Sequence, residues 1–123
     1  MATVLLVEDE PDLLLALSVR LRAAGCTCQT AGSGAEALER LQSFRPDIIV
    51  ADLLMPEMNG YELLRRLKAD PKTADIPVIV LTAVPEAGRA PRAHELCSAA
   101  RIVQKLYDAE ALIAILRELV ITS

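Results

Sequence analysis

The sequence is poor in aromatic residues, since only Phe44, Tyr61 and Tyr107 carry an aromatic ring and tryptophan is absent. Proteins that bind single-stranded nucleic acid stack bases on aromatic side chains, so this class has little support. An excess of positive charge is also lacking, because the formal net charge is -4 at pH 7. We therefore expect no direct binding of nucleic acid.

Long apolar runs are missing as well. No stretch approaches the roughly 20 apolar residues of a membrane-spanning helix, and no basic segment followed by a long apolar one marks a secretory signal. Cys26, Cys28 and Cys97 form no CxxC pair, and His94 is the only histidine, so a metal site built on cysteine and histidine is not indicated. We expect reduced, partly buried thiols in a cytoplasmic protein without membrane contact.

Aliphatic residues are abundant and bring the hydrophobic content to 53%. We expect a single domain over residues 1–123, large enough to bury about two-thirds of its unfolded surface. Short apolar runs alternate along it with amphipathic segments. The runs predict strands at residues 3–7, 26–30, 48–51, 77–82 and 101–104.

Local chemistry predicts where the helices begin and end. Pro11 suits a first helical position, and Gly25 suits the residue that closes that helix. The pattern Ser33-x-x-Glu36 is a capping box, which predicts a second helix through about Phe44. Further helices are expected to begin near Asn59, Pro91 and Asp108.

Five strands alternating with five helices predict an α/β fold, doubly wound, with a parallel sheet and helices on both faces. We expect the strand order 2-1-3-4-5. The fourth helix is expected to be irregular or shortened, because Pro85, Gly88 and Pro91 interrupt the sequence before residue 92.

Polar residues lie at the carboxyl ends of four of the expected strands, at the edge where ligands bind in such folds. They are Glu8 and Asp9, Asp52, Thr82, and Lys105. Crowded carboxylates repel one another unless a cation offsets them, and oxygen ligands with open positions suit Mg²⁺. A hydroxyl and an ammonium group could bind a phosphoryl group, and an aspartate can accept one.

With these residues placed, the whole chain resembles a response-regulator receiver domain of two-component signalling, a flavodoxin-like (βα)5 sandwich. The matching pieces are Val7-Glu8-Asp9-Glu10, Asp52-Leu53-Leu54-Met55-Pro56-Glu57-Met58-Asn59-Gly60, Leu81-Thr82-Ala83 and Lys105. The second of these is a highly specific motif. The resemblance implies a signalling domain in a phosphorelay rather than an enzyme acting on other molecules.

The resemblance also implies roles for individual residues. Asp52 would accept a phosphoryl group from a histidine kinase or a histidine phosphotransfer protein. Mg²⁺ would be held by Asp9, Asp52 and the backbone carbonyl of Leu54, with Glu8 just outside the ligand set. The phosphoryl group would be bound by two residues, Thr82 and Lys105.

The chain departs from the family pattern near its output surface. Leu106 stands where the family has a proline after the lysine, and Ile102 stands where it has the aromatic switch residue. A non-proline cis bond costs about 2.5–4 kcal/mol, so we expect a trans Lys105–Leu106 bond. The hypothesis is that phosphorylation is retained while the switch or partner face is rewired. A homodimer through residues 91–104 and the last helix is left open.

Two alternatives remain for the function. One is a pseudo-receiver, a protein-interaction module that does not depend on phosphorylation. The other is a nucleotide-binding α/β domain, because Gly32-x-Gly34-x-x-Ala37 precedes Asp52 at about the spacing of a dinucleotide fingerprint. The second is disfavoured, since the pattern sits in the second strand-to-helix turn and no substrate domain follows.

Overall fold

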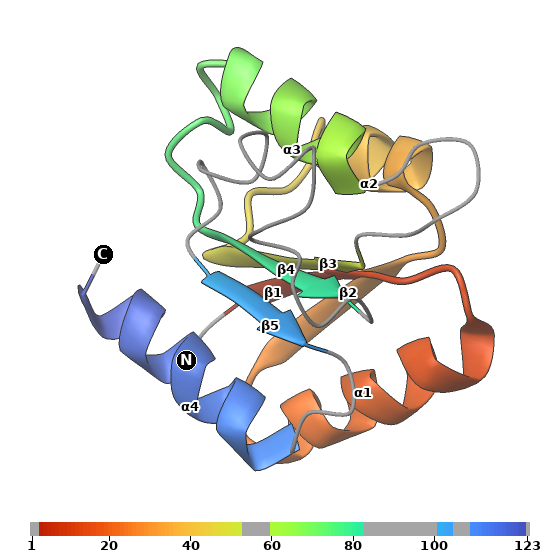
Figure 1. Ribbon diagram of the computed structural model, residues 1–123, viewed down its shortest axis with the longest axis vertical. Helices are drawn as coiled ribbons and strands as arrows, with labels where there is room; N and C mark the ends of the chain where they lie inside the picture. The colour runs from red at the N-terminus through yellow and green to blue at the C-terminus, as the bar shows by residue number, and fades with distance from the viewer. Residues whose placement is uncertain (1–2, 53–59, 83–100, 105–108, 123) are drawn as a thin grey trace.

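The structure is a computed structural model, and it describes residues 3–52, 60–82, 101–104 and 109–122. Figure 1 shows a central sheet with α2 and α3 on one face and α1 and α4 on the other. The strands are β1 (Thr3–Val7), β2 (Thr27–Ala31), β3 (Ile48–Asp52), β4 (Val78–Thr82) and β5 (Arg101–Gln104). The helices are α1 (Pro11–Ala23), α2 (Gly34–Arg40), α3 (Gly60–Ala69) and α4 (Ala109–Thr122).

All strand pairs of the sheet are parallel, and the order is β2-β1-β3-β4-β5. The predicted architecture and strand order are therefore confirmed. The predicted helix near residues 91–100 lies outside the described residues. Among the helices that are described, none combines the length and the apolar character required to cross a membrane.

The central strand β3 is buried along its whole length. Ile49 and Ala51 pack into the core beneath α2 and α3, whereas Ile48 and Val50 pack into the core beneath α1 and α4. A strand buried on both faces requires apolar residues at every position, which is why its sequence is a continuous aliphatic run. That run ends at Asp52, so the carboxylate sits at the end of a fully buried strand.

Helix α1 ends as the sequence predicts. Gly25 has a φ of 96°, a left-handed conformation that glycine adopts without steric strain. Its N–H donates to the Arg22 carbonyl at 3.0 Å, and the Cys26 N–H donates to the Leu21 carbonyl at 3.0 Å. This paired closure satisfies carbonyls at the helix end and turns the chain into β2.

The predicted end of α2 is wrong, because the helix stops at Arg40 rather than near Phe44. The Gln42 N–H donates to the Glu39 carbonyl at 3.2 Å, and the Ser43 N–H donates to the Arg40 carbonyl at 3.1 Å. These bonds span three residues instead of four, so the helix tightens into turns before the proline at position 46.

The start of α2 follows the predicted capping box in part, because the return bond from Glu36 goes to Gly32, the residue before the N-cap Ser33. Ser33 Oγ accepts a hydrogen bond from the Glu36 N–H at 3.1 Å, and Glu36 Oε2 accepts one from the Gly32 N–H at 2.8 Å. Replacing Ser33 with alanine is expected to lower the free energy of unfolding by about 1 kcal/mol, because it removes the oxygen that caps the helix. Urea denaturation measures this change.

The matched control for that substitution is Ser43→Ala, because Ser43 lies in the turns after α2 and its hydroxyl makes only a long, exposed bond of 3.4 Å to the Arg40 carbonyl. Its expected effect is below about 0.5 kcal/mol. Equal losses in the two variants would show that the Ser33 hydroxyl has no special role at the helix start.

The thiols that the structure describes agree with the expected reduced state. Cys28 is buried and Cys26 is half-buried, and both are free. Burial raises the pKa of the Cys28 thiol, so little of it is ionised near neutral pH. The third cysteine, Cys97, lies outside the described residues.

Candidate functional site

Three carboxylates meet where β1 and β3 end. Val7 pairs with Ala51 in the parallel register, so Glu8 and Asp52 follow at the same level of neighbouring strands. Glu8, Asp9 and Asp52 each offer a carboxylate oxygen, and these oxygens lie within 4.8 Å of one another. The sequence prediction that these acids converge is therefore confirmed.

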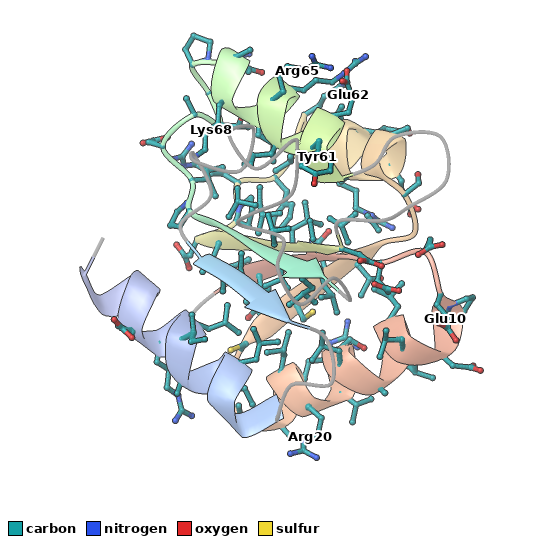
Figure 2. The ribbon with its side chains drawn as sticks, in the orientation of Figure 1. Glu10, Arg20, Tyr61, Glu62, Arg65 and Lys68 are labelled. Carbon is teal, nitrogen blue, oxygen red and sulfur yellow. The ribbon has the colours of Figure 1, made fainter. Side chains whose placement is uncertain are left out.

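Backbone contacts explain why the first two acids are placed differently. The Glu8 N–H donates to the Ala31 carbonyl at 3.0 Å, which extends the pairing of β1 and β2 by one residue. The chain then turns into α1, whose first helical hydrogen bond runs from the Leu14 N–H to the Glu10 carbonyl at 2.9 Å. Asp9 is left in the turn between strand and helix, and Figure 2 shows Glu10 at the start of α1.

The three side chains differ sharply in their exposure to solvent. Glu8 is 3% exposed and Asp52 is 2% exposed, whereas Asp9 is exposed at the surface. Two buried carboxylates beside a third one repel one another when all are ionised. A cation that approaches from the side of Asp9 would relieve this repulsion without entering the core.

The chemistry of the donor set fits a hard divalent cation. All three groups offer oxygen, the ligand atom that Mg²⁺ and Ca²⁺ prefer, and no described cysteine or histidine joins the cluster. A few carboxylates beside a solvent-facing side suit Mg²⁺, which usually retains several waters. The cluster could therefore hold a metal ion and leave positions open for an oxygen of another molecule.

The sheet register places one further predicted site residue, Thr82, at the same edge. Asp52 pairs with Leu81, so Thr82 ends β4 one residue beyond the level of Asp52. Thr82 in turn pairs with Gln104, the last residue of β5. The Thr82 side chain and the whole of Lys105, Leu54 and Leu106 lie outside what the structure describes, so their predicted roles stay predictions.

A family model described as the response regulator receiver domain matches residues 4–117, which is most of the chain. The chain therefore belongs to the response-regulator receiver family, and the resemblance carried by its sequence motifs is confirmed.

Solved structures agree with this assignment. The receiver domain of a signal transduction histidine kinase from Syntrophus aciditrophicus superposes with a TM-score of 0.87 and 34% identity, covering 98% of this chain and 90% of that chain. The response regulator TrrA from Thermotoga maritima, solved in complex with Mg²⁺-BeF, gives a TM-score of 0.86 and 28% identity, covering 97% and 99%.

Curated relatives are longer proteins. The DNA-binding response regulator MtrA of Mycolicibacterium smegmatis is 38% identical over 80 residues, covering 65% of this chain and 34% of the relative. The phosphate regulon transcriptional regulatory protein PhoB of Pseudomonas aeruginosa is 41% identical over 81 residues, covering 66% and 35%. The matched stretches span about a third of each relative's length.

Proposed function

We propose that this receiver domain is a phosphoacceptor of a two-component phosphorelay and that Asp52 is the residue that takes the phosphoryl group. One observation carries the proposal. Asp52 is 2% exposed at the end of the central strand, and its carboxylate lies within 4.8 Å of those of Glu8 and Asp9. Crowding buried acidic side chains does not stabilise a fold, so such a cluster indicates a functional site.

The proposed donor is a histidine kinase or a histidine phosphotransfer protein. A carboxylate oxygen of Asp52 attacks the phosphorus of a phosphohistidine, and a new oxygen–phosphorus bond forms. The phosphorus–nitrogen bond breaks, and its electron pair stays on the imidazole. The donor histidine is thus restored and Asp52 carries an aspartyl phosphate.

Asp9, Asp52 and the Leu54 carbonyl would hold Mg²⁺, with Glu8 next to the ligand set. The ion would offset the negative charge that the incoming phosphoryl group brings to the cluster. The Glu8 backbone is held by its hydrogen bond to the Ala31 carbonyl. Its carboxylate adds negative charge beside Asp9 and Asp52, which favours the binding of a divalent cation. A solved neighbour, the receiver domain of a sensor histidine kinase from Pseudomonas aeruginosa, has a magnesium ion coordinated in its active site cleft; its TM-score is 0.85, at 27% identity.

Thr82 and Lys105 would bind the phosphoryl oxygens through a hydroxyl and an ammonium group. Thr82 ends β4 beside Gln104, the last residue of β5, and this pairing at the edge that holds Asp52 supports the proposal for Thr82. The position of Lys105 stays a prediction. These features do not identify the output partner. A cytoplasmic location, a trans Lys105–Leu106 bond and a rewired switch at Ile102 stay predictions.

The test is to incubate the chain with acetyl phosphate and to measure its intact mass. With Mg²⁺ present, we expect the mass to rise by one phosphoryl group. With a chelator in place of Mg²⁺, we expect at least about a hundredfold slower incorporation, since the crowded carboxylates would then repel an anionic donor. A chain that gains no adduct in Mg²⁺ would favour the pseudo-receiver alternative.

A further inference from the structure

Helix α1 carries two large apolar side chains on the surface. Leu15 is 63% exposed and Val19 is 54% exposed, although Leu17 and Leu21 of the same helix are buried against the sheet. Leu15 and Val19 are four residues apart, so they lie side by side on one face of the helix. These are the exposed large hydrophobic residues of the part of the chain that the structure describes.

Two opposite charges flank this apolar pair along the helix. Asp12 lies toward the N-terminal end of α1 and Arg22 toward its C-terminal end, and both are exposed. We define the outer face of α1 as Asp12, Leu15, Val19 and Arg22. At 3.6 residues per turn, these four positions fall within about 80° of one another around the helix axis.

The outer face of α1 has an internal symmetry. Residues 12 and 22 are equally distant in sequence from residue 17, and so are residues 15 and 19. If a second copy of the helix packs antiparallel across this point, Leu15 meets Val19 of the other copy. Each Asp12 then lies near the other copy's Arg22, whose Nη2 donates to the Cys28 carbonyl of its own chain at 2.9 Å and whose guanidinium has further N–H groups for a carboxylate. A two-fold interface needs this kind of self-complementarity.

We propose that two copies of this chain associate through the outer face of α1, as an antiparallel pair related by a two-fold axis. The two charge pairs select the antiparallel orientation, because a parallel pair would place Asp12 beside Asp12 and Arg22 beside Arg22. The apolar pair supplies the burial. This contact does not rest on the phosphoacceptor role of Asp52, although α1 begins two residues after Asp9 and the contact would lie beside the acidic cluster.

The association is expected to be weak. One helix from each copy buries less surface than the roughly 1,200 Å² in total at which standard interfaces begin, so it belongs with transient contacts. We expect a dissociation constant of about 0.1–1 mM. Such a contact forms mainly where copies are held close together, and a concentrated sample reproduces that condition.

Sedimentation equilibrium of the full chain, up to about 1 mM and without a phosphodonor, tests the proposal. Asp12→Arg and Arg22→Asp should each weaken association at least about tenfold, because each places like charges opposite one another twice per dimer. The double variant D12R/R22D restores opposite charges and should return to within about threefold of the native value.

Arg20→Asp is the matched control, since Arg20 has the same charge and lies in the same last turn as Arg22. It sits about 100° around the helix from Val19, and Figure 2 shows its side chain pointing away from the body of the protein. Its association should stay within about threefold of native. Circular dichroism checks the fold, because Arg22 also donates to the Cys28 carbonyl at 2.9 Å.

Three results would overturn the proposal. The native chain could sediment as a monomer throughout, or the single charge variants could associate as the native chain does. The double variant could also remain as weak as the single ones. If the single variants associate as the native chain does but are phosphorylated more slowly by a donor protein, the outer face of α1 binds that donor and not a second copy.

Discussion

Replacing Asp52 with asparagine is expected to abolish the phosphoryl adduct and, at the same time, to make the fold more stable. The adduct is lost because an amide cannot act as the nucleophile. Stability rises because the buried cluster of Glu8, Asp9 and Asp52 loses one of its mutually repelling charges. At the effective dielectric constant of protein sites, a pair of charges near 5 Å interacts by about 3 kcal/mol, so we expect a gain of about 1–3 kcal/mol.

Urea denaturation in metal-free buffer measures this gain in the free energy of unfolding. Adding Mg²⁺ should reduce the difference in the free energy of unfolding between Asp52→Asn and the native chain. The reason is that the ion binds the folded native cluster better than the one that has lost a charge. Asp12→Asn is the control, since Asp12 is exposed in the first turn of α1 and lies outside the cluster. An Asp52→Asn protein that is less stable than the native chain in metal-free buffer would show that the three carboxylates do not strain the fold.

The second large effect is expected in the core that supports the site. Ile49 is fully buried in β3, three residues before Asp52, and packs beneath α2 and α3. Replacing Ile49 with alanine removes three buried carbon atoms and leaves a cavity in the middle of the sheet. The expected loss is about 3–4 kcal/mol in the free energy of unfolding, again measured by urea denaturation.

Leu15→Ala provides the contrast, because it deletes a similar number of carbon atoms at a position that is 63% exposed. We expect a change below about 0.5 kcal/mol in dilute solution. A loss below about 1 kcal/mol for Ile49→Ala would mean that the core around β3 relaxes to fill the space, and that the strand does not hold Asp52 rigidly.

The sequence predicted the inner strands of the sheet well because β1 and β3 are buried almost throughout, whereas the edge strand β2 followed from its alternating pattern. Continuous aliphatic runs such as Ile48 to Ala51 have few other interpretations, and breakers bound them on either side. The alternation of strands and helices predicted a parallel sheet, and the expected order 2-1-3-4-5 is one of the common orders of doubly wound sheets. The end of α2 was mispredicted, because the turns after Arg40 keep helix-like hydrogen bonds over three residues, and no proline or glycine marks the boundary.

The acidic cluster was predictable for a related reason. In a parallel sheet of this order, residues that follow neighbouring strands must meet at one edge, so Glu8, Asp9 and Asp52 could be placed together from the sequence. Their unequal burial could not, because it depends on the point where the chain turns from β1 into α1. The extent to which Leu15 and Val19 are exposed was not predicted either, since the apolar spacing indicates which helix residues face the core but not how far neighbouring elements cover the others.

The most direct test of the central claim is to find where the phosphoryl group resides. The chain is treated with acetyl phosphate and Mg²⁺, the acyl phosphate is reduced with borohydride, and the modified position is mapped by peptide mass spectrometry. Our account predicts a single modified residue, Asp52. Modification at Glu8 or Asp9 instead, or no modified carboxylate in the cluster, would contradict it.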